Sequence, residues 1–508
     1  MSTHDLTPEE FRRIGHQVID WIAEYRSTIE QRRVQPDVEP GWVRARLPDR
    51  LPEHGEPFDA LLRDLDEVIL PATTHWQHPS FFGYFPCNSS LASVLGDMLS
   101  AGLGVQGMMW STSPACTELE QHLTDQLAEA LGLPASFTTA GGGGGMITEA
   151  SSTANLVALL AALHRASPQW RGAGVGGRET VYVSAHTHSS MDKAVRIAGL
   201  GGNAVRVVDT SAATGALLPS ALDAAITADV RAGRRPVMAC ATVGTTSTGA
   251  VDPVRALGEV CARHGVWLHV DAAWAGVAAV CPEFRGMLDG LELAGSFCTD
   301  AHKWLLTAFD CTLLWTRHPR VLADALAITP EFLRNAASES GMVVDYRDWQ
   351  IPLGRRFRAL KLWAVLRSFG LRGLREHIRR HVSLATELAS WVRSDPRFEL
   401  GAPPSLGLVC LRVRTGHGSK ADDEATRAVM ERVNATGLAM LTHTVVDGRY
   451  LIRVSVGVPA TERRHLEALW QSLCAAAAVA SPAVISPALD AMPASHDASS
   501  ATQDAPRG

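Results

Sequence analysis

A lysine in an apolar setting is the first residue whose type could do chemistry. The stretch TDAHKWLLTAFDC places Lys303 between His302 and Trp304, ahead of two leucines. Burial lowers the pKa of a lysine, and a neutral amine can form an imine with a carbonyl compound. A lysine at a helix end that extends toward solvent would leave the same pattern, and this stretch alone favours that interpretation.

An aspartate at the end of an expected strand favours a catalytic role for Lys303 over a structural one. The stretch GVWLHVDAAWAG is apolar up to Asp271 and then turns to small residues. Such an acid can simply cap the next helix. However, an acid at the carboxyl end of one buried strand and a lysine on a neighbouring strand are what pyridoxal phosphate (PLP) requires. The lysine forms the imine, and the acid keeps the pyridine nitrogen protonated.

A phosphate site is the third requirement of PLP. The stretch AGGGGGMITEASSTANLVALLAAL contains a glycine run, and Ser151 and Ser152 then open an expected helix. Free backbone N–H groups at a helix start bind anions, and the two hydroxyls add donors. Flexible linkers have the same glycine content. No G-K-[ST] follows, which disfavours a P-loop nucleotide site.

Two histidine pairs raise the alternative of a metal site. His186 and His188 share one face of an expected strand, and His75 and His78 lie in HWQH. No thiol or carboxylate cluster completes a zinc-binding set, so we predict no metal. A single imidazole stacked on a cofactor ring is the favoured role.

These side chains must be positioned by a regular framework. Short β-rich runs (TVYVSA, AVRVVD, PVMACATVG, VWLHVDAA and CTLLWTR) alternate with helical patterns over residues 151–166 and 254–265. This alternation predicts an α/β domain with a mostly parallel sheet and a site at the carboxyl ends of its strands. Long helices and then the runs GLVCLRV and YLIRVSVG predict a smaller C-terminal α+β domain.

The chain ends complete the predicted organisation. Thr7 and Glu10 form a capping box for a helix over residues 6–26, whose apolar stripe includes Phe11 and Tyr25. We expect an N-terminal helical segment over 1–85, a PLP-binding domain over 86–365 and a small domain over 366–478. Residues 479–508 are rich in Ala, Pro and Ser, and we expect a disordered tail there.

Composition excludes several classes of protein. The 508 residues are 46% hydrophobic and 20% charged, with a net charge of −6, so no basic field attracts nucleic acid or an anionic membrane. The N-terminus does not resemble a signal peptide, and no long apolar run predicts a membrane span. The nine cysteines show no paired spacing, which predicts reduced thiols and a cytoplasmic protein.

Several motifs in this order resemble one family, the PLP-dependent group II decarboxylases, and within it the aromatic-L-amino-acid decarboxylases. The resemblance runs from about residue 8 to about residue 475. It is carried by QPDVEPGWVRARLP, HWQHPSFFGYFP, SPACTELE, AHTHSSMDKA, WLHVDAAWAG, DAHKWLLTAFDC and DWQIPLGRRFRALKLW. The resemblance implies the aspartate aminotransferase-like fold (fold type I), PLP as cofactor, and a homodimer with shared sites. It also implies that the N-terminal helices clamp the partner subunit.

The resemblance assigns roles around the cofactor. Lys303 is implied as the Schiff-base lysine, Asp271 as the partner of the pyridine nitrogen, and His188 and Ala273 as the residues on the two faces of the ring. Thr246 lies beside cofactor and substrate in this comparison. The implied phosphate neighbours are Ala150, Ser151, Ser152, Asp300 and His302. Many relatives have Asn at position 300, and a carboxylate there needs a proton or a shifted position to avoid repelling the phosphate.

The resemblance also implies an aromatic substrate pocket. Its positions here are Trp76, Tyr84, Phe85, Pro86, Met108, Phe309 and Gly354. Met108 and Gln106 replace Phe and Ile of animal members, at positions that reach the neighbouring subunit's pocket. In plant relatives, Gly at position 354 accompanies indole substrates and Ser accompanies phenols. An aromatic L-amino acid (tryptophan, tyrosine, DOPA or phenylalanine) is therefore the expected substrate.

One residue departs from the decarboxylase pattern. In that family a tyrosine of a flexible loop, contributed across the dimer interface, serves the final proton transfer. The stretch TPEFLRNAASESG aligns with this loop and places Phe332 at the tyrosine position. In plant relatives the same replacement accompanies aldehyde synthases, which use oxygen and release an aldehyde, ammonia and peroxide.

Three hypotheses follow. An aromatic amino acid decarboxylase is favoured because almost every other position fits, with Phe332 filling the closed pocket while His188 or water delivers the proton. An aldehyde synthase rests on Phe332 alone, since insect aldehyde synthases carry Asn where this chain has His188. A catalytically inactive PLP-binding dimer is disfavoured by the presence of both Lys303 and Asp271.

Overall fold

The computed structural model describes residues 5–480. The tail expected over 479–508 lies outside the described residues, apart from its first two residues, which end helix α15 (Arg463–Ala480). Within the described chain, no helix combines the length and the apolar character needed to cross a membrane.

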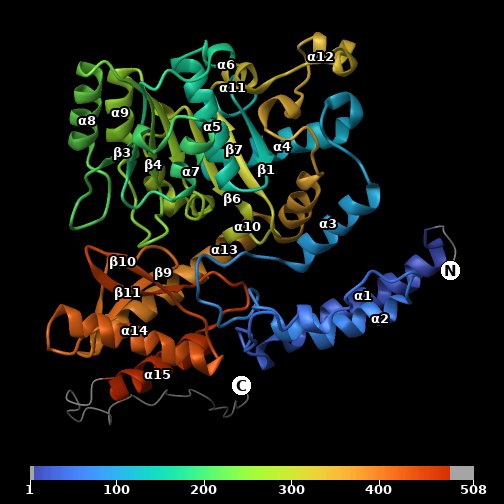
Figure 1. Ribbon diagram of the computed structural model, residues 1–508, viewed down its shortest axis with the longest axis vertical. Coiled ribbons are helices and arrows are strands. Elements are labelled where there is room, and N and C mark those ends of the chain that lie inside the picture. The colour runs from blue at the N-terminus through green and yellow to red at the C-terminus, as the bar shows by residue number, and fades with distance from the viewer. Residues whose placement is uncertain (1–4, 481–508) are drawn as a thin grey trace, which may run out of the picture.

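The N-terminal helices form an arm that projects from the rest of the subunit (Figure 1). Helix α1 (Pro8–Thr28) starts with the predicted capping box, in which the Thr7 hydroxyl accepts from the Glu10 N–H and the Glu10 carboxylate accepts from the Thr7 N–H. Helix α2 (Phe58–Asp64) lies alongside. Of the predicted apolar stripe, Ile14 is buried, but Phe11 is 55% exposed. Part of the stripe therefore has no cover within one subunit.

A seven-stranded sheet forms the centre of the large domain. Its strands are β1 (Gly144–Thr148), β2 (Glu179–Ser184), β3 (Val205–Val208), β4 (Arg235–Thr242), β5 (Trp267–Asp271), β6 (Ser296–Asp300) and β7 (Thr312–Thr316), in the order β1-β7-β6-β5-β4-β2-β3. Strands β6, β5, β4, β2 and β3 run parallel, and β7 is antiparallel to both of its neighbours. The prediction of a mostly parallel sheet is confirmed, although β7 makes the sheet mixed. Strands β1 and β6 were not among the expected strands.

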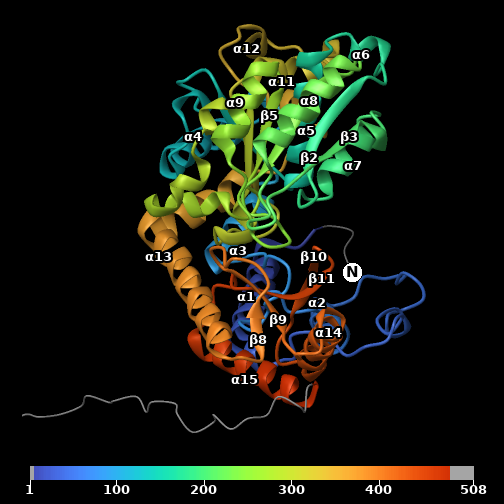
Figure 2. The same cartoon turned by 90° about the vertical axis from the view of Figure 1, so that its left-hand side faces the viewer.

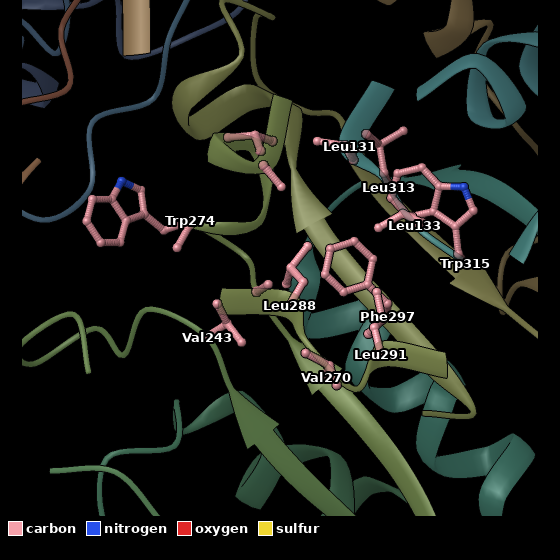
Figure 3. Close-up of a cluster of buried hydrophobic side chains, with 14 of the residues drawn as sticks. Leu131, Leu133, Val243, Val270, Trp274, Leu288, Leu291, Phe297, Leu313 and Trp315 are labelled. Atoms are coloured by element: carbon pink, nitrogen blue, oxygen red, sulfur yellow. The ribbon is translucent and has the colours of Figure 1, made fainter. Parts of the chain in front are cut away.

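Helices cover both faces of this sheet. The helices of the large domain are α3 (Leu91–Leu103), α4 (Pro114–Leu131), α5 (Ser151–Ala166), α6 (Trp170–Ala173), α7 (Ser190–Ile197), α8 (Pro219–Arg231), α9 (Val254–His264), α10 (Ala301–Trp304), α11 (Pro319–Leu326) and α12 (Ala336–Glu339). Of these, α4, α8 and α9 pack on one face and α5, α7 and α11 on the other. Alternate strand residues point to opposite faces, so Val270, Phe297 and Trp315 enter the core shared with α4, α8 and α9 (Figure 3). Trp267, Cys298 and Leu314 face α5, α7 and α11.

The glycine run serves packing rather than phosphate binding. Gly144 and Gly145 begin β1, so the run lies at the opposite end of this strand from helix α5. A Cβ on Gly143 would lie 2.1 Å from the Ser136 carbonyl oxygen, and one on Gly145 would lie 2.6 Å from Thr124. The expected link between the run and the phosphate site is therefore wrong, because close backbone approach explains these glycines.

The C-terminal domain is built on a second sheet. Its strands β8 (Phe398–Leu400), β9 (Leu408–Val413), β10 (Thr442–Val446) and β11 (Arg449–Ser455) are antiparallel in the order β10-β11-β9-β8, and α14 (Ser419–Thr436) and α15 pack on them. Helix α13 (Arg358–Ser394) links the two domains along one side of the molecule (Figure 2). It bends at Gly370, whose φ of 58° and ψ of 174° are not helical. The boundary expected between 365 and 366 thus falls inside α13.

Candidate active site

Two neighbouring strand ends bring the predicted acid and lysine together. Strand β5 ends at Asp271 and the parallel strand β6 ends at Asp300, and α10 follows β6 directly with Lys303 in its only turn. Both carboxylates are almost fully buried. Because the carboxyl ends of parallel strands meet at one edge of a sheet, Lys303 and Asp271 face the same space.

This space is a cavity of about 320 Å³. All ten residues expected around the cofactor line it: Ala150, Ser151, Ser152, His188, Thr246, Asp271, Ala273, Asp300, His302 and Lys303. Four lining residues were not singled out from the sequence: Cys87, Thr242, Gly244 and Trp274. Of these, Trp274 stood in the WLHVDAAWAG motif, three residues after Asp271, and its position there was the available signal.

The Asp271 carboxylate is held by uncharged donors. Its Oδ1 accepts from the backbone N–H of Ala273 at 3.0 Å, and its Oδ2 accepts from the Asn155 amide at 2.9 Å. Asn155 lies on α5 one turn after Ser151, so the two share a helix face. Sequence reasoning missed Asn155 because an amide inside a helix carries no chemical signature of its own, although its i, i+4 spacing from Ser151 was visible.

The Lys303 ammonium pairs with Asp300 rather than being isolated. Its Nζ lies 2.7 Å from Asp300 Oδ2. Burial lowers the pKa of Lys303, but Asp300 outweighs this effect and leaves the pKa above its usual value. The expectation of a lysine that readily loses its proton is therefore wrong for the cofactor-free site, because this chain has a carboxylate at position 300.

Asp300 is stabilised in its charged form. Its Oδ1 accepts from the hydroxyls of Ser151, at 2.6 Å, and Thr312, at 2.5 Å. Burial raises the pKa of Asp300, but Lys303 and His302 more than offset this and lower it below its usual value. The Lys303 cation neutralises Asp300 within the protein, which limits repulsion of a phosphate in a way that the sequence did not suggest.

The predicted phosphate site lies at the first turn of α5. Ala150 occupies the N-cap position and offers no side-chain acceptor, so the N–H groups of Ser151 and Ser152 have no cap. His302 lies nearby. Its Nε2 is 3.7 Å from Asp300 Oδ2, and its Nδ1 is hydrogen-bonded to the backbone of Cys311. An uncapped helix start with added hydroxyls suits a phosphate group.

His188 lines the cavity and is anchored through one ring nitrogen. Its Nδ1 lies 2.9 Å from the Ser190 hydroxyl at the start of α7. The His188 ring is exposed to the open cavity, but the protein around it still lowers its pKa by partial desolvation, although Asp271 opposes the shift. The neighbouring His186 contacts Ser247 at 3.3 Å, and His75 contacts the Tyr25 hydroxyl. Within residues 5–480, no three His, Cys, Asp or Glu side chains gather in a way that could hold a metal ion.

Aromatic side chains form the outer wall of the cavity. Trp76, Tyr84, Phe85 and Phe309 all line it, as predicted for the substrate side. The Trp76 and Tyr84 rings are stacked with centroids 5.7 Å apart, and Phe85 stacks on Trp274 at 4.1 Å. Tyr84, Trp76 and Phe309 are each more than a third exposed, so the wall is open to a ligand.

Three predicted substrate residues lie outside this cavity. Pro86 packs against Gly457, because a Cβ placed on Gly457 would lie only 3.1 Å from the Pro86 ring. Met108 and Gly354 lie together, because the Met108 N–H donates to the Gln106 side chain and a Cβ on Gly354 would meet that side chain at 3.8 Å. Neither reaches the cavity of its own subunit.

The loop of Phe332 is held at its base. The backbone of Phe332 lies in a short 3-10 helix (Glu331–Leu333), and its side chain is outside the described part of the structure. Leu333 is buried beside it, and Asn335 caps the one-turn helix α12 by accepting from Ser338. The Ser338 hydroxyl donates to Asp345, which connects the loop to the large domain.

Comparison with known proteins decides the family. The model of the pyridoxal-dependent decarboxylase conserved domain matches residues 40–414. The chain belongs to this family. The chain is 46% identical over 470 residues to phenylacetaldehyde synthase of Arabidopsis thaliana, covering 92% of this chain and 95% of the relative. It is 44% identical over 472 residues to tyrosine decarboxylase 2 of Narcissus pseudonarcissus, covering 92% and 94%.

A solved structure agrees in fold as well as in sequence. The crystal structure of Oryza sativa TDC with PLP and tryptamine superposes with a TM-score of 0.92 at 41% identity, covering 94% of this chain and 99% of that chain. The predicted family and the fold type I architecture are thereby confirmed, and PLP is the cofactor of the enzyme. The cavity suits it, since an amine, an acceptor carboxylate and an uncapped helix start surround one space.

Proposed function

We propose that the enzyme converts aromatic L-amino acids to arylalkylamines and CO2. The observation that carries this proposal is the position of the aromatic wall, Trp76, Tyr84, Phe85 and Phe309, on the same cavity as Lys303. Tryptophan, tyrosine, DOPA and phenylalanine are the candidate substrates, because aromatic rings pack well in such a cavity. The relative named tyrosine decarboxylase and the structure with tryptamine support this class.

Most residues of the site are proposed to bind the cofactor, and one is proposed to contact the substrate. Bound PLP supplies a ring that withdraws the electrons left when a carboxylate departs as CO2. In this proposal Lys303 holds the cofactor, Asp271 keeps the ring nitrogen protonated, and Ser151, Ser152 and His302 bind the phosphate. The remaining members of the set are Ala150 beside the phosphate, Ala273 and His188 on the two ring faces, and Thr246 next to the substrate.

We also propose a homodimer with shared sites. One subunit exposes many large apolar side chains on α1, on α3 and nearby, namely Phe11, Ile19, Leu91, Leu95, Met98, Leu99, Leu103, Ile351 and Leu353. Clusters of this size on a protein surface mark interfaces. Met108 and Gly354 lie among them, which supports their predicted contribution to the neighbouring subunit's pocket. Sedimentation analysis tests this, and a monomer at micromolar concentration contradicts it.

The cytoplasm is the proposed location. All nine cysteines are unpaired, and seven of them are buried. Free thiols of this kind are typical of a reducing compartment.

An aldehyde synthase is the second candidate, and Phe332 is the residue that favours it. The overall reaction balances as amino acid plus O2 plus H2O, giving aldehyde, CO2, NH3 and H2O2. The relative named phenylacetaldehyde synthase supports this alternative as closely as the decarboxylases support the first. A catalytically inactive PLP-binding dimer is the third and least favoured candidate, because Lys303 and Asp271 are both present and face the cavity.

Product analysis separates the candidates. Purified enzyme is incubated with PLP, oxygen and each aromatic L-amino acid, and amine, aldehyde, CO2 and peroxide are measured. We expect amine and CO2 in equal amounts. Aldehyde and peroxide in near-equal yield with little amine contradict the first candidate, and absence of turnover with PLP bound supports the third.

The Phe332 loop has its own test. Because Phe332 lacks a hydroxyl, Phe332→Tyr adds a proton donor, and any aldehyde formed beside the amine is expected to fall relative to the amine by about a hundredfold, the lower end of the range for a positioned acid. Tyr84→Phe is the matched control, since it changes a hydroxyl on the cavity wall rather than on the loop. An unchanged ratio in Phe332→Tyr means that this position does not decide the product.

A further inference from the structure

A continuous line of hydrogen bonds runs behind the cavity through strands β5 and β6 and helices α5 and α7. It begins at the Trp267 indole, whose Nε1 donates to the Ser296 hydroxyl at 2.9 Å. The same hydroxyl lies 2.8 Å from Nδ1 of His269. All three side chains are almost completely buried. Water therefore does not compete for these bonds.

The line continues from strand β5 into helix α5. His269 Nε2 lies 2.8 Å from the side-chain oxygen of Asn155. Burial lowers the pKa of His269 to about 4, so the ring is neutral near pH 7 and carries one proton. Asn155 is itself completely buried. Each polar atom of these two side chains must therefore find its partner within the protein.

Asn155 then branches toward the cavity. Its amide nitrogen donates to Asp271 Oδ2 at 2.9 Å and to the Ser190 hydroxyl at 3.0 Å. The Ser190 hydroxyl lies 2.9 Å from His188 Nδ1, and the Ser190 backbone N–H donates to the same nitrogen at 3.2 Å. One amide thus contacts both the Asp271 carboxylate and the serine that holds His188.

One end of the line has a fixed donor. An indole N–H can only donate, so the Ser296 oxygen accepts from Trp267. The Ser296 oxygen keeps a second lone pair, so the direction of its bond with His269 Nδ1 is set from the other end of the line.

The carboxylate end of the line sets the direction. An ionised carboxylate can only accept, so the nitrogen of Asn155 faces Asp271 and its oxygen accepts from His269 Nε2, which leaves His269 Nδ1 to accept from the Ser296 hydroxyl. The second amide proton is donated to the Ser190 oxygen. The Ser190 backbone N–H can only donate and points at His188 Nδ1, so this nitrogen is an acceptor and the Ser190 hydroxyl proton is directed to it as well.

We propose that this one-way line holds neutral His188 as the tautomer that carries its proton on Nε2. Asn155 and Ser190 are its positioning residues, and Trp267, Ser296 and His269 fix their orientation. Because Nδ1 is turned toward α7, the Nε2 edge of the ring is the one available to the cavity that His188 lines.

The tautomer gives the cavity a fixed hydrogen-bond donor. Phe332 has no hydroxyl to offer, whereas His188 Nε2–H can donate a hydrogen bond to a water held between Lys303 and the aromatic wall. This consequence rests on the proposed decarboxylation, in which the α-carbon must receive a proton after CO2 leaves. His188 keeps its own proton and orients the water that delivers one, and solvent re-protonates the hydroxide that remains. Ser190 and Asn155 would therefore affect the rate of product formation through His188, without contacting the substrate.

The tautomer itself can be observed directly. Neutron diffraction from deuterated crystals of the full chain with PLP, grown near neutral pD, shows which ring nitrogen carries a deuteron. We expect a deuteron on His188 Nε2 and none on Nδ1. A deuteron on Nδ1, alone or together with one on Nε2, overturns the proposal. This result does not depend on which product the enzyme forms.

A variant series tests whether the line acts on the reaction. Ser190→Ala removes the hydroxyl while the backbone donor stays, and it is expected to lower kcat for amine about three- to tenfold, the effect of one hydrogen bond. KM and the Kd of PLP are expected to change less than about twofold, because Ser190 lines neither site. Ser190→Thr keeps the hydroxyl and should restore kcat.

The neighbouring Ser189 supplies the control, since it is exposed and its Ser189→Ala variant should behave as the parent enzyme. Equal kcat values for Ser190→Ala and Ser189→Ala overturn the proposed role in the reaction. If the parent enzyme forms neither amine nor aldehyde, the proposed function fails, while the neutron map still decides the tautomer. The two failures are therefore distinguishable.

Discussion

Asp271 and Asp300 end adjacent parallel strands and are almost equally buried, but their partners differ in charge. Asp271 accepts from the Ala273 N–H and the Asn155 amide, which are neutral. Asp300 contacts the Lys303 ammonium at 2.7 Å. The first carboxylate therefore keeps its negative charge available for a ligand, and the second is neutralised within the protein.

The comparison shows that position in a fold does not determine what a buried acid does. Neutral donors stabilise a carboxylate without cancelling its charge, so Asp271 can attract a protonated ring nitrogen. The Lys303 ammonium neutralises Asp300, and the same ion pair restrains the lysine that we propose holds the cofactor. Four predictions, from the largest effect to the smallest, test this difference.

Removing the charge of Asp271 should have the largest effect. Asp271→Asn keeps the size of the side chain but cannot hold the ring nitrogen protonated, so we expect kcat to fall by about two to three orders of magnitude, as for loss of a preorganised electrostatic contact. Steady-state kinetics with saturating PLP measures this. A decrease of less than about fivefold would falsify the assigned role.

Removing the cation beside Asp300 should destabilise the cofactor-free protein. Lys303→Met leaves a buried carboxylate without its counter-ion, and we expect a loss of about 2 kcal/mol in unfolding free energy, reduced because a quarter of the Lys303 side chain is exposed. Adding Asp300→Asn should recover most of this loss. Denaturant unfolding of both variants measures it, and no recovery in the double variant means that the two side chains are not coupled.

Neutralising Asp300 should strengthen cofactor binding. Asp300→Asn removes a negative charge next to the predicted phosphate site and frees the Ser151 hydroxyl, so we expect the Kd of PLP to fall about tenfold, or about 1.4 kcal/mol. Asp310→Asn is the matched control, because Asp310 pairs with Arg358 instead of Lys303. Equilibrium dialysis measures both, and weaker binding in Asp300→Asn contradicts the comparison.

The same pair predicts a pH dependence of cofactor capture. Asp300 raises the pKa of Lys303, so less neutral amine is present at a given pH, and the rate of covalent capture of PLP should rise as pH increases from 7 to 9. In Asp300→Asn the burial of Lys303 is opposed only by the weaker effects of Asp271 and Cys87, so the pKa of Lys303 falls. The profile should therefore move to lower pH. Borohydride trapping at each pH measures capture, and superimposed profiles rule out control by Asp300.

Part of this site was predictable because Asp271 ends an apolar strand, and the first turn of α5 was evident from its hydroxyl residues. Lys303 was identified from the apolar residues that follow it. The strand before it, β6 (SFCTD), was missed because three of its five residues are polar or acidic. Asn155 and His269 were missed because their hydrogen-bond partners are distant in sequence. The pairing of Asp300 with Lys303 was missed because the sequence does not give the distance between the two side chains.

The glycine run has a consequence for the order of folding. Glycine loses more backbone entropy than any other residue, so a strand that begins with Gly144 and Gly145 gains little from its own propensity. Its partner β7 lies about 170 residues further along the chain, since Gly144 pairs with Thr316. Closing so large a loop is costly before other contacts exist. Gly144 packs against the Trp349 ring and Gly145 against the Trp315 ring, both too closely for a Cβ. We therefore expect β1 to join the sheet late, after β7 and these two rings have formed the surface that only glycine can approach.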